Sequence, residues 1–299
     1  MTATRIATLL PSVTEIACAL GLRDRIVARS HECDFPPGIE AVPAVTSSRL
    51  PADAVTQAQI DVAVTDAAVA GEALYDVDAD LLARLAPDLV ITQSLCDVCA
   101  VAEGAVLAAV RDLEPPAHVV SLAPGRLDEV IDSVQDVADA AGVADAGRAL
   151  RESLRARLDA VRARVAGRPP VRVAAVEWID PPWSAGHWVP DQVSVAGGVE
   201  VLVAAGERSA RATWDDVRAA RPDVVVLMPC GLSLAEVVEL ADAVPEMPAR
   251  IAAVDASGLF SRPGPRLVEG AEVMARILHP RPADEPGGSA WTWLPGRGG

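Results

Sequence analysis

The sequence predicts an α/β protein made of two Rossmann-like lobes that are joined by a single long helix. Short apolar runs alternate with amphipathic segments from Ile6 onward, which is the pattern of parallel strands covered by helices. Residues 144–165 are rich in Ala, Leu, Arg, Asp and Glu and contain no Pro, which favours one long helix. Gly167-Arg-Pro-Pro170 ends that helix, and the strand–helix alternation then starts again.

In the first half, buried strands are expected at residues 6–10, 26–28, 89–92 and 119–122. Helices are expected from residue 12 to about 21 and at 58–70, 80–86 and 127–140. Ser12-Val-Thr-Glu15 has the spacing of a capping box, in which the Ser and Glu side chains bond free backbone N–H groups. The first helix is therefore expected to begin at Ser12.

In the second half, strands are expected at residues 171–177, 224–228 and 251–254, and helices at 191–196, 213–220, 233–243 and 266–278. These elements divide the chain into an N-terminal lobe (1–143), a connecting helix (144–168), a C-terminal lobe (169–280) and a tail (281–299). The tail is rich in Pro and Gly and is expected to be mobile, with Trp291 and Trp293 as residues that could dock.

The two halves share a motif. Residues 80–91 and 215–226 both predict a helix, then Pro-Asp, then an apolar strand. Each copy runs into a cysteine, Cys96 in the first and Cys230 in the second. Because ligands of parallel sheets bind beyond the C-terminal strand ends, both loops are expected to face one cleft.

Composition excludes some classes of function. The net charge of −16 argues against binding to nucleic acid or to an anionic membrane surface. No apolar run is long enough to span a bilayer, and the opening Met-Thr-Ala-Thr-Arg has no basic, apolar leader. Five cysteines, an odd number, suit a reducing compartment. The sequence therefore predicts a cytoplasmic location and no membrane insertion.

Four stretches resemble a known family. They are residues 5–15 (Arg-Ile-Ala-Thr-Leu-Leu-Pro-Ser-Val-Thr-Glu), the Pro-Asp-Leu-Val-Ile strand, the long helix, and Ser261-Arg-Pro-Gly-Pro-Arg266. They are similar to the cobalamin and iron-siderophore substrate-binding proteins of ABC importers, over residues 4–280. The opening is most similar to the cobalamin-binding branch. The resemblance implies a binding protein rather than an enzyme, with a small-molecule ligand between two lobes and, if the protein is exported, an ABC permease as partner.

His31-Glu32-Cys33-Asp34 follows a predicted strand and is stopped by Pro36-Pro37. Polar and reactive side chains at a strand end point to ligand contacts, although a solvated loop explains them equally well. Ser12, His31, Glu32 and Gln93 are the ligand contacts expected in the first lobe.

Residues 177–191 form the richest motif of the second half. Glu177, Trp178, Trp183, His187 and Trp188 lie in a Pro- and Gly-rich stretch, and flat indole rings suit a planar or aromatic ligand. A packing cluster with a hydrogen-bonded His187 is the alternative.

Arg262 lies in the Pro-rich turn before the last helix. Held rigidly there, its guanidinium could bind a carboxylate, amide or phosphate of the ligand. The Pro residues also explain the turn without any ligand.

The remaining cysteines suggest a second function. Cys96-Asp-Val-Cys99 is expected to open a helix, which favours thiolates. Together with Cys33 and Cys230, and with His31 or His187 nearby, these thiols could hold a metal ion. Cys18 lies among apolar residues of the first helix and is expected to be an inert core thiol.

Two functions follow from these patterns. The first is a substrate-binding protein that holds a corrinoid or a similar metal complex between its lobes. The second is a cytoplasmic metal- or thiol-dependent protein, such as a metallochaperone, redox sensor or enzyme. Thiols that lie close together would favour the second function, and a wall of Trp side chains would favour the first.

Overall fold

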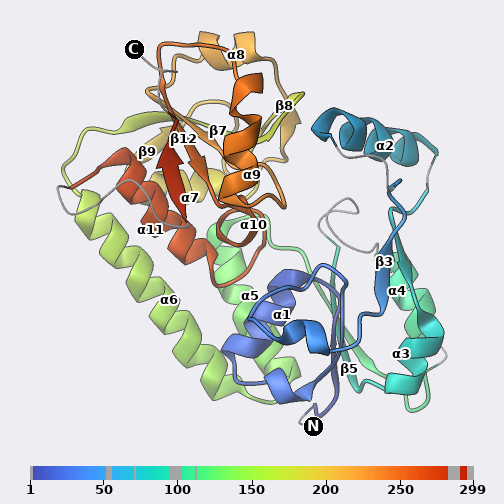
Figure 1. Cartoon of the computed structure of the whole chain (residues 1–299). Coiled ribbons are helices and arrows are strands. Elements are labelled where there is room, and N and C mark those ends of the chain that lie inside the picture. Colours follow the sequence, from blue (N-terminus) through green and yellow to red (C-terminus); the bar gives the residue numbers. More distant parts are fainter. Residues whose placement is uncertain are drawn as a thin grey trace. The chain divides into compact units, whose positions relative to one another are not determined.

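The computed structural model describes residues 3–51, 56–70, 72–94, 103–111, 113–281 and 290–294. The chain divides into two compact units, each built on its own sheet (Figure 1). Unit 1 comprises Met1–Pro124 and Glu129–Ser153, and unit 2 comprises Gly125–Asp128 and Leu154–Gly299. The two-lobed α/β class predicted from the sequence is confirmed, whereas the finer segment boundaries stay a prediction.

Unit 1 contains a parallel sheet with the strand order β2-β1-β5-β6. The strands are β1 (Ile6–Thr8), β2 (Ile26–Arg29), β5 (Leu89–Gln93) and β6 (His118–Leu122). Its helices are α1 (Pro11–Ala19), α3 (Ala79–Leu85), α4 (Glu103–Val110) and, from Glu129 onward, α5 (Leu127–Ala140), and short 3₁₀ turns occupy Arg23–Arg25 and Ile39–Ala41. Buried Leu9, Leu82, Val90 and Val106 pack together in one core cluster.

A small antiparallel sheet lies outside this parallel sheet. It pairs β3 (Thr46–Ser48) with β4 (Tyr75–Val77), and α2 (Gln57–Ala70) lies between them in the sequence. The sequence predicted α2 but neither strand, because three residues are too few to show an alternating pattern. This small sheet matters for the site because it brings Thr46 and Tyr75 next to the end of β2.

Unit 2 contains a mixed sheet with the order β10-β8-β7-β11-β12-β13, and β9 also pairs with β7. Its strands are β7 (Val171–Ile179), β8 (Pro182–Ser184), β9 (Gly198–Glu200), β10 (Ala210–Arg211), β11 (Val224–Leu227), β12 (Arg250–Val254) and β13 (Trp291–Trp293). Its helices are α7 (Val189–Val195), α8 (Trp214–Ala219), α9 (Leu234–Glu239), α10 (Ala256–Leu259) and α11 (Leu267–Leu278), and Leu240–Ala243 forms a 3₁₀ turn. The strands β7, β11, β12 and β9 run parallel, whereas β8, β10 and β13 pair antiparallel.

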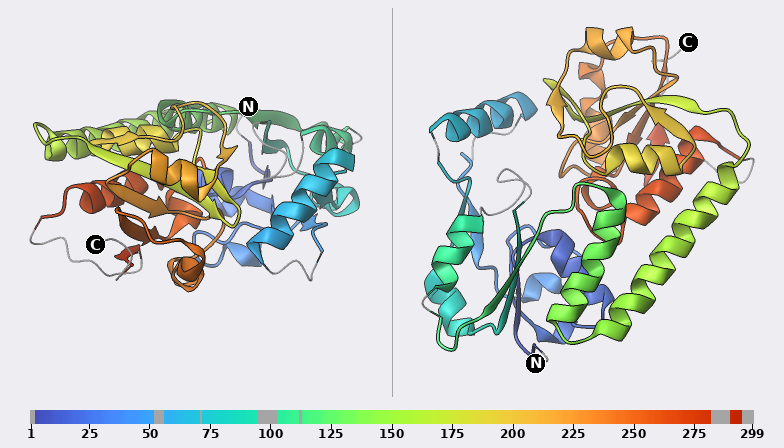
Figure 2. Two further views of the ribbon diagram at one scale, coloured as in Figure 1. Left: turned by 90° about the horizontal axis from the view of Figure 1, so that it is seen from above. Right: turned by 180° about the vertical axis from the view of Figure 1, so that it is seen from behind.

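Helix α6 (Ala144–Val165) is continuous and has the bounds predicted from the sequence (Figure 2). Its first half is grouped with unit 1 and its second half with unit 2. In unit 2 the Arg157 guanidinium forms a two-point ion pair with Glu272 of α11, with distances of 2.8 and 2.9 Å. Within the described part of the chain, no helix combines the length and the apolar character needed to cross a membrane.

The Pro-Asp motif of unit 1 connects the start of β1 to the start of β5. The Asp88 carboxylate accepts hydrogen bonds from the backbone N–H and hydroxyl of Thr4, at 2.9 and 2.8 Å, and from the backbone N–H of Arg5 at 3.1 Å. The Arg5 guanidinium in turn donates to the carbonyl oxygens of Leu85 and Ala86 at the end of α3. Ala86, just before Pro87, adopts a left-handed φ of 42°.

Unit 2 repeats this arrangement. The Asp223 carboxylate accepts the backbone N–H of Arg172 at 2.9 Å, and the Arg172 guanidinium donates to the carbonyls of Ala220 and Arg221 after α8. Arg221, just before Pro222, has a φ of 48°. The sequence repeat is therefore a duplicated structural device that joins the first strand of each unit to the helix end before the neighbouring strand.

The capping box predicted at Ser12 is not formed. Helix α1 begins at Pro11, which needs no partner for a backbone N–H, and no side chain caps it at Leu10. Ser12 is thus the second helical residue. Capping boxes do form at Thr213 with Asp216 and at Ser233 with Glu236.

Candidate functional site

In unit 1, His31 follows β2 and is held by Thr46 of β3. The backbone N–H of His31 donates to the Thr46 hydroxyl oxygen at 2.9 Å, and the His31 Nδ1 lies 2.7 Å from the same oxygen. The Thr46 hydroxyl donates to Ser30 Oγ at 3.1 Å. The Arg29 guanidinium donates to the carbonyls of Ser30 and His31. Both the loop and the imidazole are therefore fixed by hydrogen bonds.

Glu32 and Tyr75 complete this cluster. The Tyr75 hydroxyl donates to Glu32 Oε1 at 3.4 Å, and the rings of Tyr75 and His31 lie 5.6 Å apart at an angle of 47°. Burial lowers the pKa of His31, and the neighbouring Arg29 lowers it further. Both effects favour the neutral imidazole, which is the form that can ligate a metal.

Three other predicted residues of unit 1 are buried. Ser12 lies in α1 and Gln93 ends β5, with 2% and 6% of their surface exposed. Cys33 is 2% exposed, and its Sγ lies 3.0 Å from the Thr14 hydroxyl, which donates to Thr8. The Cys33 thiol thus packs within unit 1, and its role as a metal ligand stays a prediction.

In unit 2, the hairpin of β7 and β8 pairs Trp178 with Trp183. The two residues are direct partners in the antiparallel register, so their side chains share one face of the hairpin. Both indoles are partly exposed, and so is the adjacent Glu177. The Arg211 guanidinium, from β10, lies 5.8 Å from the centre of the Trp183 ring. This face combines flat apolar surface with a cation.

His187 and Trp188 have different surroundings. His187 adopts a left-handed φ of 54° and donates its backbone N–H to the Glu207 carbonyl at 2.6 Å. Burial and, to a smaller extent, Arg208 lower the pKa of His187, and its Nδ1 is buried without a hydrogen-bond partner in the described residues. Trp188 is 7% exposed and donates its indole N–H to the Phe260 carbonyl at 2.7 Å. These surroundings fit the packing alternative for Trp188, and its role as a ligand contact stays a prediction.

Arg262 lies in the turn before α11 and is partly exposed. The Gly264 N–H donates to the Arg262 carbonyl at 2.7 Å, and the Leu267 N–H donates to the Gly264 carbonyl at 3.1 Å. The Arg266 guanidinium lies directly against Gly258, so a side chain at that position would require Arg266 to move. These backbone hydrogen bonds hold the turn, and the role of Arg262 as a ligand contact stays a prediction.

Only two of the four cysteines of the predicted thiol cluster, Cys33 and Cys230, lie within the described residues. Cys96 and Cys99 lie outside the described residues. Cys230 is exposed, and its backbone N–H donates to the Glu177 carbonyl at 3.0 Å. Cys18 is partly exposed in α1, so the prediction of a buried core thiol is wrong. No group of three or more His, Cys, Asp or Glu side chains able to hold a metal ion occurs among the residues that the structure describes.

Sequence reasoning missed Thr46, Tyr75 and Arg211. Each contacts a predicted residue from a short strand that the pattern did not reveal. The single tyrosine of the chain was a usable signal for Tyr75, whereas nothing marked Thr46.

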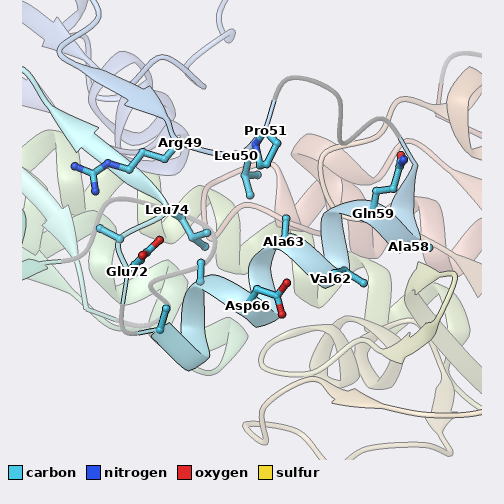
Figure 3. A pocket seen from close by; sticks show the side chains of 13 residues that line it. Arg49, Leu50, Pro51, Ala58, Gln59, Val62, Ala63, Asp66, Glu72 and Leu74 are labelled. Atoms are coloured by element: carbon cyan, nitrogen blue, oxygen red, sulfur yellow. The ribbon is translucent and has the colours of Figure 1, made fainter.

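A hollow of about 730 Å³ lies in unit 1 beside α2. Figure 3 shows Ala63 of α2 on one side of it and Leu50 and Leu74 on the other. None of the predicted ligand contacts lines it.

Comparison with known proteins places the chain in a family. The sequence profile of the family described as periplasmic binding protein matches residues 6–252. A search of curated proteins finds no match.

Several solved structures share the fold. The periplasmic vitamin B12-binding protein BtuF of Vibrio cholerae is 21% identical, with 92% of this chain and 96% of that chain covered and a TM-score of 0.65. The periplasmic heme-binding protein RhuT of Roseiflexus sp. RS-1 is 24% identical, with 93% and 98% covered and a TM-score of 0.67. The ABC-type Fe³⁺-hydroxamate transport protein of Saccharomonospora viridis is 19% identical, with 93% and 94% covered and a TM-score of 0.64.

These findings overturn the prediction of a cytoplasmic location, because the matched family and the BtuF and RhuT structures are periplasmic. The prediction rested on the composition of the opening residues and on the odd number of cysteines, and neither feature determines the compartment in which a protein works. By the match over residues 6–252, this chain belongs to the family of periplasmic binding proteins.

Proposed function

We propose that this protein is the substrate-binding component of an ABC importer and that its ligand is a corrinoid or a similar metal complex. Proteins of the same fold bind vitamin B12, heme and Fe³⁺-hydroxamate, which are all metal ions enclosed by a larger organic ligand. An ABC permease is the partner that this function requires.

The Trp178–Trp183 pair is the observation that carries the proposal. Two partly exposed indoles on one hairpin face are unusual on a protein surface unless they contact something, because each indole offers a large apolar area. A planar macrocycle can stack on such a face at a small cost in side-chain entropy. Arg211 beside Trp183 adds a cation for the carboxylate or phosphate groups of such ligands.

The other proposed contacts lie at strand ends, in turns and, for Ser12, at the start of helix α1. In unit 2 they are Glu177, His187 and Arg262, and in unit 1 they are His31, Glu32, Gln93 and Ser12. These positions follow the rule that ligands of parallel sheets bind beyond the C-terminal strand ends. The thiol-based alternative is not supported by the buried, hydrogen-bonded Cys33.

Ligand titration tests the proposal. Unit 2 contains all six tryptophans of the chain, so binding near Trp178 and Trp183 should quench the intrinsic fluorescence. Aquocobalamin, hemin and a ferric hydroxamate complex are titrated separately into the purified protein. We expect saturable quenching by aquocobalamin with a dissociation constant of about 1 μM or lower, which corresponds to about −8 kcal/mol. Binding of none of the three would overturn the proposal.

A further inference from the structure

The hydrogen bonds around Thr46 determine the tautomer of His31. The Thr46 hydroxyl has one proton, which it donates to Ser30 Oγ. The Thr46 oxygen accepts the backbone N–H of His31, and His31 Nδ1 lies 2.7 Å from the same oxygen. The proton in that short contact must therefore belong to the imidazole. This arrangement favours the tautomer of neutral His31 that carries its proton on Nδ1 and a lone pair on Nε2.

The loop that carries His31 is also held by Arg29, and Tyr75 lies beside the imidazole. The Arg29 guanidinium bonds the carbonyls of Ser30 and His31 and, through Nε, the carbonyl of Val42 at 3.0 Å. The ring of Tyr75, a residue that is 8% exposed, lies 5.6 Å from the imidazole at an angle of 47°. Nε2 makes no hydrogen bond to any described residue, and the side chain is partly exposed.

This is the arrangement found around histidines that ligate metals. Such a histidine donates one ring N–H to a neighbouring acceptor, which fixes the ring and leaves the other nitrogen for the metal. In unit 1 the acceptor is the Thr46 hydroxyl oxygen.

We propose that His31 Nε2 coordinates the metal of the bound complex, so that the ligand is a metal macrocycle with an exchangeable axial position. This inference rests on the proposed function. In the binding step the Nε2 lone pair forms a bond to the metal, and the water that occupied the axial position leaves as neutral water. The oxidation state of the metal does not change. A complex whose axial positions are both filled by non-exchangeable groups would lack this contact.

The first experiment needs no ligand. In protein labelled with ¹⁵N-histidine, the nitrogen chemical shifts and couplings of His31 should show a proton on Nδ1 near neutral pH. The Thr46→Val variant should lose this preference and show a mixture of tautomers. A wild-type His31 with its proton on Nε2 would overturn the inference, because that nitrogen would then have no lone pair.

The second experiment measures coordination by absorption spectroscopy. Aquocobalamin and hemin are each added to the wild type, to His31→Ala, to Thr46→Val and to His118→Ala, which removes an exposed histidine at the start of β6. The wild type and the control should show the band shift of a nitrogen-coordinated metal, and free imidazole should restore that shift in His31→Ala. Thr46→Val should weaken binding of aquocobalamin by about tenfold to a hundredfold.

The outcomes separate the two proposals. If the wild type binds neither aquocobalamin, hemin nor a ferric hydroxamate, the proposed function fails. If the wild type binds aquocobalamin or hemin and His31→Ala gives the same spectrum and affinity, the function stands and coordination by His31 is wrong. Loss of the band shift in His187→Ala, with the shift retained in His31→Ala, would also overturn the inference.

Discussion

Units 1 and 2 use the same framework and carry different chemistry on it. In both, an Arg–Asp pair joins the first strand to a helix end through the Pro-Asp motif. After its strands, unit 1 presents a hydrogen-bonded polar cluster around His31, whereas unit 2 presents the Trp178–Trp183 face. The framework positions the loops, and the loops determine what can be bound.

The difference extends to the edges of the two sheets. The sheet of unit 1 is parallel, whereas that of unit 2 is extended by the antiparallel strands β8, β10 and β13. These additions supply the residues that distinguish unit 2, since Trp183 lies on β8 and Arg211 on β10. An antiparallel addition to a parallel sheet thus gives unit 2 an aromatic surface that the strand ends alone would not provide.

The largest expected effect is a pH dependence of the free energy of unfolding that Glu200 gives to unit 2. Burial raises the pKa of Glu200 in unit 2 to about 7, and hydrogen bonds from the N–H groups of Ala175, Val201 and Leu202 offset only part of this rise. Between about pH 5 and 7, the Glu200 carboxyl therefore keeps its proton in the folded state, whereas it has lost this proton in the unfolded state. The free energy of unfolding should fall by about 3 kcal/mol as the pH rises from 4.5 to 7.

Tryptophan fluorescence is suited to this measurement because every tryptophan lies in unit 2. Urea unfolding of the wild type is compared with that of Glu200→Gln at several pH values. The difference between the two proteins isolates the carboxyl group. A wild type that gains stability relative to the variant as the pH rises would mean that the three N–H groups keep Glu200 ionised.

The second prediction concerns ligand affinity and unit 2. Replacing Trp178 or Trp183 by Ala should weaken ligand binding about fivefold to a hundredfold, because each substitution removes stacking worth about 1–3 kcal/mol. Trp293→Phe, on β13, is the matched control and should bind normally. Titration calorimetry gives the affinities. Unchanged binding in both Ala variants would leave the indole pair with a packing role only.

The third prediction tests the duplicated framework. Asp88 accepts bonds from two backbone N–H groups and a hydroxyl, whereas Asp223, which is exposed, accepts the N–H of Arg172. Asp88→Ala should therefore lower the free energy of unfolding by about 1–2 kcal/mol, and Asp223→Ala should lower it by less. Thermal unfolding followed by circular dichroism measures both. Equal losses would show that the two copies contribute alike.

The pH dependence of the Asp88 contribution has the opposite sign to that of Glu200. Burial raises the pKa of Asp88, but the hydrogen bonds from Thr4 and Arg5 together outweigh it and hold the pKa below its ordinary value. The stabilisation is present above the ordinary pKa of Asp and is lost as the pH falls through the lowered value. The Asp88→Ala variant and the wild type should therefore converge in stability in acid.

The order of strands and helices could be predicted from the sequence because it follows a repeating pattern of apolar and polar residues. Apolar strands followed by amphipathic helices, and the repeated Pro-Asp, are local patterns, and α6 was bounded correctly for the same reason. The strands of two or three residues, such as β3 and β10, were missed because they form only through pairing with a distant segment. At α1, the rigid ring of Pro11 decided the start of the helix, and the capping pattern of Ser12 and Glu15 had no effect.

The candidate site was predictable only as a set of residues. His31 and the Trp motif stood out by composition, but their partners are far away in the chain. Thr46 lies 15 positions from His31, and the carbonyl that accepts the Trp188 indole N–H lies 72 positions further along. Sequence pattern alone therefore gave no way to separate Trp183, which is partly exposed, from Trp188, which packs in unit 2.

The smallest expected effect lies at the far edge of the unit 2 sheet, where β13 pairs with β12. The Arg250 guanidinium lies 3.6 Å from the centre of the Trp293 ring, and Trp291 is 4% exposed. A cation–π contact at an exposed site contributes about 0.5–1 kcal/mol, so Arg250→Ala should speed amide exchange in β13 by about two- to fivefold. Trp291→Ala should raise it further, since it also removes buried area.

Hydrogen exchange resolved by mass spectrometry measures this directly, with β5 of unit 1 as an internal reference that neither substitution should change. Because β13 is joined to the unit 2 sheet through one neighbour, β12, its opening is expected to be local and to leave the rest of the sheet protected. Unchanged exchange in Arg250→Ala would show that backbone pairing and Trp291 hold the strand without the cation. Faster exchange throughout β12 and β11 would instead show that β13 is an integral part of the unit 2 sheet, which would make the two units differ in their cores as well as at their edges.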